Sequence, residues 1–306
     1  MKSKALKIPT LLLISAVAVL VGKGLQGLLH DLPLRALMWD EGTFSGIAAT
    51  LGYEWSAWVT SPQVSDTIGL IVKVIGASLL VGGLLLLIPA IRKTRLTIFS
   101  LSWNGVLLFA LILLATKENF WRFGYFIEHA LQLGAPLLLL GMILGKTATS
   151  LLPTMRVLTA LTFTGHGLFA MGYYPVPFHF LLMTMEGLGE FYLNLTGATL
   201  TEQGARSLLY FVGWIDFLAA AMLLVPWGRI GISKRFVFSL YSIALAWIIP
   251  WALLTTMARW WSNSGFSSLS NLIYYWGPEV LVRLPHILIP VLIWKLTRVD
   301  TTVYAN

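Results

Sequence analysis

The sequence predicts an all-α, polytopic integral membrane protein with about eight transmembrane helices. Hydrophobic residues make up 57% of the chain and charged residues only 11%, whereas a soluble domain carries roughly 25% charged residues. The apolar residues gather in runs of about 20, the length that crosses a bilayer as a helix. The 13 Trp and 10 Tyr residues suit a protein that lines two membrane interfaces.

Eight apolar segments are the candidate transmembrane helices, and each is bounded by charged, glycine-rich or polar stretches. They are Ile8–Leu29, Ile68–Ile91, Leu96–Thr116, Phe126–Leu144, Val157–Tyr174, Leu208–Trp227, Phe236–Ala258 and Val280–Leu296. The connections on one side are short. On the other side two are long, residues 30–67 and 173–207, and long connections often cover or form a functional site.

The distribution of Lys and Arg predicts the orientation. If the N-terminus is cytoplasmic, the inner segments hold 13 of the 21 basic residues and the outer segments hold 6. The positive-inside rule therefore predicts that both termini are cytoplasmic, in the inner membrane of a bacterium or archaeon. Because the net charge of +8 follows the topology, we expect no nucleic-acid partner. The chain has no Cys, which excludes disulfides and thiolate metal sites within it.

The two halves of the chain share motifs in the same order. The first predicted helix ends in Gly22-Lys23-Gly24-Leu25, and the fifth ends in Gly165-His166-Gly167-Leu168. The second and sixth helices both end in a proline before a basic loop, and the fourth and eighth both open with Glu. This order predicts two parallel four-helix repeats, residues 1–150 and 151–306, with sites expected between them.

Each half resembles the DoxX-like four-helix membrane module, in which a glycine-punctuated first helix precedes an outer loop. The second half, with Gly-His-Gly-Leu-Phe-Ala-Met-Gly at 165–172 and Pro-Val-Pro at 175–177, is most similar. The first half departs from the pattern by its longer outer loop. The resemblance covers nearly the whole chain and implies the architecture first. That group includes quinone-linked oxidoreductase subunits, so the resemblance implies a redox partner as a second expectation, after the architecture.

Ionisable groups within the predicted spans are the candidate functional residues, because burying them in a bilayer is costly. Most lie in the outer half of the membrane. His166 stands out because Gly165 and Gly167 allow another helix or a ligand to approach closely. We expect catalytic roles for His166 and Asp216, and ligand-binding roles for Lys23, Lys73, Glu128, His129, Arg283 and His286.

Each candidate also has a structural interpretation. Lys23 and Lys73 could extend to the interface, and Asp216 could make a single hydrogen bond between helices. Glu279 and Arg283 are four residues apart and could form a structural pair. No helix has the paired His spacing of a four-helix cytochrome, and we expect no metal site.

Three functions remain open. The first is a redox-linked subunit in which His166 exchanges a proton with a quinone, Asp216 orients that His, and nearby cations stabilise the reduced form. No redox group is encoded, so a partner would supply the electrons. The second is a transporter or binding protein for a small anion or lipid headgroup. The third is a non-catalytic scaffold whose loop at 30–67 docks a periplasmic protein. Whether the chain is an enzyme is left open, and membrane lipid is an expected partner in each case.

Overall fold

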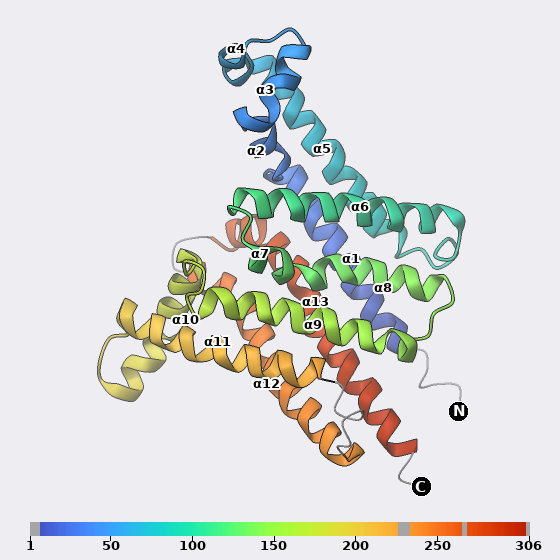
Figure 1. Cartoon of the computed structure of the whole chain (residues 1–306), viewed down its shortest axis with the longest axis vertical. Coiled ribbons are helices and arrows are strands. Elements are labelled where there is room, and N and C mark those ends of the chain that lie inside the picture. Colours follow the sequence, from blue (N-terminus) through green and yellow to red (C-terminus); the bar gives the residue numbers. More distant parts are fainter. Residues whose placement is uncertain (1–6, 226–232, 265–267, 304–306) are drawn as a thin grey trace.

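A computed structural model describes residues 7–225, 233–264 and 268–303, and all regular secondary structure within them is helical (Figure 1). The helices are α1 (Lys7–Leu29), α2 (Leu34–Met38), α3 (Glu41–Thr50), α4 (Trp55–Thr60), α5 (Pro62–Leu85), α6 (Arg95–Glu118), α7 (Phe123–Glu128), α8 (Ala130–Ile143), α9 (Ala148–Ala170), α10 (Phe178–Thr196), α11 (Glu202–Leu224), α12 (Lys234–Ser264) and α13 (Leu269–Val303).

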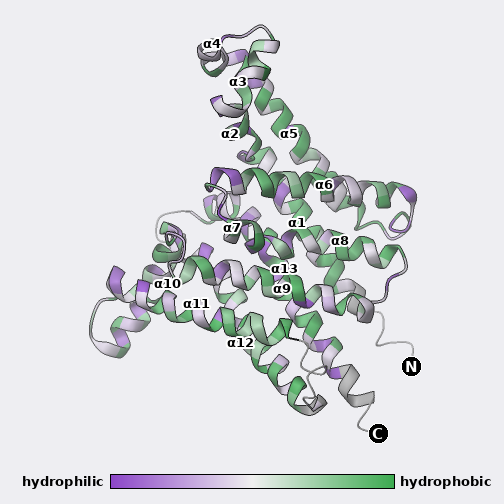
Figure 2. Cartoon of the chain, in the orientation of Figure 1, coloured by the Kyte–Doolittle hydropathy of each residue, from purple (hydrophilic) through white to green (hydrophobic). Residues whose placement is uncertain are grey.

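Six of the described helices are long and apolar enough to cross a membrane, which supports a polytopic helical membrane protein. These are α1, α5, α6, α11, α12 and α13, whose ribbons are largely hydrophobic in Figure 2. The fourth predicted span corresponds to α8, which has 14 residues. The fifth corresponds to α9, which is 23 residues long but carries Arg156 and His166.

Some residues used in the sequence argument are not described. The basic residues Lys2, Lys4 and Arg229, counted for the orientation, lie outside the described residues. The last two residues of the predicted span Leu208–Trp227 lie outside them as well.

Two helix boundaries differ from the prediction in ways that matter for the site. The last span, predicted as Val280–Leu296, is part of the 35-residue α13, which continues through three internal prolines. Membrane helices tolerate proline because neighbouring groups satisfy the freed backbone. The span predicted as Phe126–Leu144 is divided into α7 and α8 at His129. There the Leu131 amide donates to the Thr162 hydroxyl of α9 at 3.1 Å.

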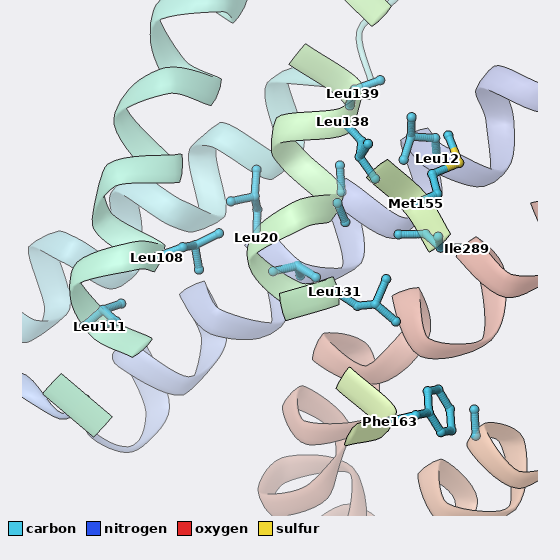
Figure 3. Packing of buried hydrophobic residues seen from close by; sticks show 14 of the residues in the cluster. Leu12, Leu20, Leu108, Leu111, Leu131, Leu138, Leu139, Met155, Phe163 and Ile289 are labelled. Atoms are coloured by element: carbon cyan, nitrogen blue, oxygen red, sulfur yellow. The ribbon is translucent and has the colours of Figure 1, made fainter. Parts of the chain in front are cut away.

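The two halves pack in matching pairs. In the first half α1 contacts α5 and α8, and α6 contacts both α5 and α8. In the second half α9 contacts α11 and α13, and α12 contacts both α11 and α13. Between the halves, α1 lies against α13 and α8 lies against α9. One apolar core spans both halves, with Leu20 and Leu131 from the first and Met155, Phe163 and Ile289 from the second (Figure 3).

Glycines bring the first two long helices of each half into backbone contact. A Cβ atom built on Gly76 of α5 would lie 2.9 Å from the carbonyl oxygen of Gly24 in α1. One built on Gly213 of α11 would lie 3.0 Å from the carbonyl oxygen of Gly167 in α9. No side chain fits at either crossing, so small residues are required where these helices meet.

The segment 30–67 folds into α2, α3, α4 and the first turn of α5, a small cap beyond the end of α1 (Figure 1). Its buried residues are Leu32, Phe44, Ala48, Trp58 and Val64, and Asp40 forms a salt bridge with Lys117 of α6. The hydrogen bond that Lys117 donates to Asp40 is the main cause that holds the pKa of this carboxyl below its usual value, and hydrogen bonds from Thr43 lower the pKa further. We call the end of the bundle that carries this cap and α10 the cap side.

Candidate functional site

A polar chamber with a volume of about 550 Å³ opens among α1, α7, α9 and α13 on the cap side. That volume is in the range of small-molecule sites, roughly 300–1,000 Å³. Its polar and charged lining residues are Lys23, Asn119, Arg122, Tyr125, Glu128, His129, Gln132, His179, Arg259, Glu279 and Arg283. Aromatic and apolar residues, including Phe169, Phe180 and Trp276, complete the wall.

Glu128 is the centre of a charged cluster that joins three helices. It ends α7 and is only 7% exposed. Its Oε1 lies 3.3 Å from Nε2 of His166 in α9 and 3.7 Å from Nη2 of Arg283 in α13. Gly165 makes this arrangement possible, because a Cβ atom there would lie 2.6 Å from the Glu128 backbone nitrogen. The predicted close approach beside His166 is confirmed, and the approaching element is α7.

A second carboxylate, Glu279, also lines the chamber. Glu279 of α13 accepts a hydrogen bond from the side-chain amide of Gln26 in α1. Lys23, one turn earlier on α1, also lines the chamber. Within the described residues Lys23 makes no hydrogen bond or ion pair. An ammonium group without a hydrogen-bond partner inside a predicted span is costly unless a ligand or water meets it.

The chamber has more cations than carboxylates. Four basic side chains line it, from α1, α12, α13 and the turn before α7: Lys23, Arg122, Arg259 and Arg283. Of the described lining residues, only Glu128 and Glu279 carry the opposite charge. Unbalanced charge in a medium of low dielectric constant is expensive, so the chamber favours an anionic occupant.

An apolar cleft of about 70 Å³ adjoins the chamber. Phe180, Arg259 and Arg283 line both spaces, so the cleft and the chamber share a wall. The apolar lining of the cleft comes mainly from α10, α11 and α12, and includes Met183, Leu209, Val212, Trp251 and Leu254. His166 and Asp216 are its other ionisable lining residues among those described.

Asp216 lines the cleft with His166 but has a different partner. Its Oδ1 accepts a hydrogen bond of 2.8 Å from the Trp247 indole, and its Oδ2 has no hydrogen-bond partner within the described residues. The carboxyl group is only 1% exposed. His166 instead contacts Glu128 and stacks on His286, with ring centroids 5.7 Å apart. The predicted orienting role of Asp216 stays a prediction, and the structure offers Glu128 as the nearer carboxylate.

The remaining predicted ligand residues lie in three different places. His129 lines the chamber, whereas His286 lies behind His166 and is 2% exposed. Nδ1 of His286 is 3.1 Å from the Arg283 carbonyl oxygen, and Nε2 has no partner within the described residues. Lys73 is in neither cavity. It lies on α5, in a separate hollow beside Arg35.

Several lining residues were not predicted from the sequence, among them Arg259 and His179. Arg259 follows the predicted span Phe236–Ala258 and was counted only as an outer charge. In the structure α12 continues to Ser264, and Arg259 is 4% exposed, donating to the Thr255 carbonyl oxygen at 2.7 Å. An arginine one residue beyond an apolar run was the available signal. His179 is the second residue of α10, within the long connection predicted at residues 173–207.

No group of three or more His, Asp or Glu side chains within the described part of the chain is arranged to hold a metal ion. Comparison with known proteins gives no family: no protein-family model, no curated protein and no solved structure matches the chain. The resemblance to the DoxX-like module therefore stays a prediction.

Proposed function

We propose that this chain binds a small, membrane-soluble amphiphile with an anionic head. The head lies in the polar chamber, and the apolar part lies toward the adjoining cleft. The surplus of cations in the chamber is the observation that carries this proposal.

The charges already engaged within the protein support an anion. Glu128 is engaged by His166 and Arg283, and Glu279 by Gln26. Lys23 has no hydrogen-bond or ion-pair partner within the described residues. An anion between Lys23 and the arginines would make charge-assisted hydrogen bonds, the stronger class of such bonds.

The apolar surfaces next to the chamber support an amphiphile rather than a free ion. The cleft meets the chamber at Arg259 and Arg283. A second apolar groove of about 300 Å³ meets it at His129, between α8 and α9. Leu137 lines that groove and is 43% exposed, so the groove reaches the lipid-facing surface. A ligand with an apolar chain gains free energy by moving from the bilayer along such a surface.

A quinone is the second candidate ligand, favoured by the pair of Glu128 and His166. Reduction of a quinone to a quinol takes two electrons and two protons. His166, which lines the cleft, is placed to pass a proton, and Glu128 of the chamber, 3.3 Å away, is placed to hold it. The electrons would come from a partner protein. Tyr125 and Trp276 offer aromatic walls for the ring.

We also propose that the chain is two parallel copies of one four-helix unit. The units are residues 1–150 and 151–306, with eight spans and both termini cytoplasmic. The matching helix pairs of the two halves support this. The equivalent contacts of Gly76 with Gly24 and of Gly213 with Gly167 support it further. The docking role of the segment 30–67 stays a prediction.

Native mass spectrometry of the detergent-extracted protein tests the ligand. Lys23→Gln removes the unpaired cation, and Lys146→Gln, an exposed lysine between α8 and α9, is the matched control. We expect an acidic amphiphile on the wild type and the control, and about ten-fold less on Lys23→Gln, as for the loss of one charged hydrogen bond.

The outcomes separate the candidates. A quinone that survives Lys23→Gln but is lost in Glu128→Gln would favour the redox function. Identical small-molecule occupancy in all four proteins, or none in any of them, would contradict both.

A further inference from the structure

A second polar hollow, of about 420 Å³, lies on the first half of the chain, between the end of α1, α2 and the first half of α5. It shares no lining residue with the chamber. Its polar lining residues are His30, Arg35, Ser65, Asp66 and Lys73.

Two cations converge in this hollow over Gly69. The Arg35 guanidinium nitrogen Nη2 lies 3.3 Å from the position that a Cβ atom of Gly69 would take. Lys73 is one helical turn after Gly69, and helical side chains lean toward the N-terminus. Lys73 is therefore on the same face of α5 as Gly69, and it lines the hollow together with Arg35. Like charges that share a hollow favour an anion between them.

The two cations differ in the partners they already have. Arg35 forms a salt bridge with Asp31, and its Nη1 is 3.4 Å from the Ser65 hydroxyl and 3.5 Å from the Ser65 carbonyl oxygen. Lys73 is exposed and makes no hydrogen bond or ion pair within the described residues. An ammonium group in a membrane-spanning helix needs a counter-charge or contact with water.

The surroundings of the hollow place it at the level of lipid headgroups. The His30 ring stacks on Tyr275 at 5.4 Å and meets Tyr274 edge-on at 4.9 Å, and both tyrosines are exposed. Tyrosine is enriched where hydrocarbon meets headgroups. On either side of Lys73 in sequence, Leu70 and Val74 are 63% and 60% exposed, as lipid-facing residues of a span are.

We propose that this hollow binds one phospholipid through its phosphate. The phosphate bridges Arg35 and Lys73 and accepts a hydrogen bond from the Ser65 hydroxyl. The acyl chains lie against Leu70 and Val74. Asp66, at the rim, accepts from a hydroxyl or ammonium group of the headgroup. The site uses none of the residues of the proposed ligand chamber, so the two proposals stand or fall separately.

A Lys73 side chain that only extends to the membrane interface, without holding a specific lipid, would give different results in a lipid-binding experiment. In that case its replacement by a neutral residue would leave lipid binding unchanged, because bulk lipid surrounds every span. In a specific site, loss of the ammonium or filling of the space over Gly69 weakens the binding of one lipid class. Gly69→Val tests the space, since the nearest atom is the end of the flexible Arg35 side chain.

The full-length protein, purified in detergent and delipidated, is titrated with phosphatidylglycerol. Retained lipid is counted by native mass spectrometry, and the shift in melting temperature is measured in parallel. Diacylglycerol with the same acyl chains and inorganic phosphate are titrated in the same way. Lys73→Gln and Gly69→Val are the test variants. Lys93→Gln, an exposed lysine between α5 and α6, and Gly46→Ala, with no atom within 4 Å of the new methyl group, are the controls.

We expect one tightly held phospholipid on the wild type, both controls and Lys23→Gln. Both test variants should lose about ten-fold in affinity, as for one charged hydrogen bond. Wild-type retention in Lys73→Gln would overturn the proposal, as would equal retention of diacylglycerol, which indicates bulk lipid only. Equal stabilisation by inorganic phosphate would also overturn it and indicate a free-anion site.

Discussion

The most direct test of the site geometry is Gly165→Ala, which adds one methyl group between α7 and α9. The new Cβ atom would lie 2.6 Å from the backbone nitrogen of Glu128 and 2.7 Å from the carbonyl oxygen of Gly124. Both atoms belong to the backbone, so no side chain can rotate away. The methyl group therefore has to push α7 away from α9.

The size of the effect follows from these distances. Ordinary contact begins near 3.4 Å, so α7 must move by roughly 0.8 Å. A shift of that size takes Glu128 Oε1 from 3.3 Å to about 4 Å from His166 Nε2, the outer limit of a close ion pair. Overpacking of this kind costs roughly 1–3 kcal/mol. We expect the free energy of unfolding to fall by that amount, and ligand occupancy of the chamber to fall with it.

Gly141→Ala on α8 is the matched control. Its methyl group would meet Leu151 at 3.6 Å, an ordinary contact. Because alanine favours the helix by roughly 0.5–1 kcal/mol over glycine, this variant should be as stable as the wild type or more stable. Stability is measured by unfolding in mixed micelles with increasing denaturing detergent. If Gly165→Ala and Gly141→Ala unfold at the same concentration of denaturing detergent, the backbone contact between α7 and α9 does not exist in the protein.

Three further changes probe other contacts. Arg283→Met removes one partner of a buried carboxylate and should cost about 3 kcal/mol of unfolding free energy; an unchanged unfolding midpoint would contradict the charged cluster. Trp247→Phe leaves Asp216 without its donor and should cost roughly 1–3 kcal/mol, measured in the same way. Asp40→Asn should speed hydrogen exchange of the cap at pH 7, because Lys117 holds the pKa of that carboxyl below its usual value. A carboxyl group whose pKa is lowered in the folded state stabilises the protein above its unfolded pKa of about 3.9, and this stabilisation is lost as the pH falls further. The difference in exchange rate between the wild type and Asp40→Asn should therefore shrink below about pH 4. A difference in rate that stays constant down to about pH 3 would exclude this salt bridge.

Much of the helical class could be predicted, because a run of about 20 apolar residues has few alternatives to a spanning helix. The boundaries were harder where polar residues interrupt the pattern. The predicted span Val280–Leu296 already included two prolines, yet α13 extends past both of its ends, from Leu269 to Val303. The step from Glu128 to His129 gave no signal of a break between α7 and α8. The break depends on Thr162 of α9, whose hydroxyl accepts a hydrogen bond from the Leu131 amide.

The candidate residues were predicted by type and depth, but not by partner. Lys23 and Lys73 looked equivalent in the sequence, since both are lysines near the outer end of a span. The structure places Lys23 in the chamber and Lys73 in another hollow. Glu128 and His166 are 38 positions apart in the chain, and only the packing of α7 on α9 brings them to 3.3 Å.

By itself the sequence determined that this chain is a helical membrane protein with buried charges, because the cost of charge and open backbone in a bilayer acts on composition and run length. It also identified the glycines beside His166, because only a small residue permits close helix contact. Which charges share one chamber was decided by the tertiary structure. Helix rotation and crossing depend on contacts between residues far apart in the chain, and no local pattern records them.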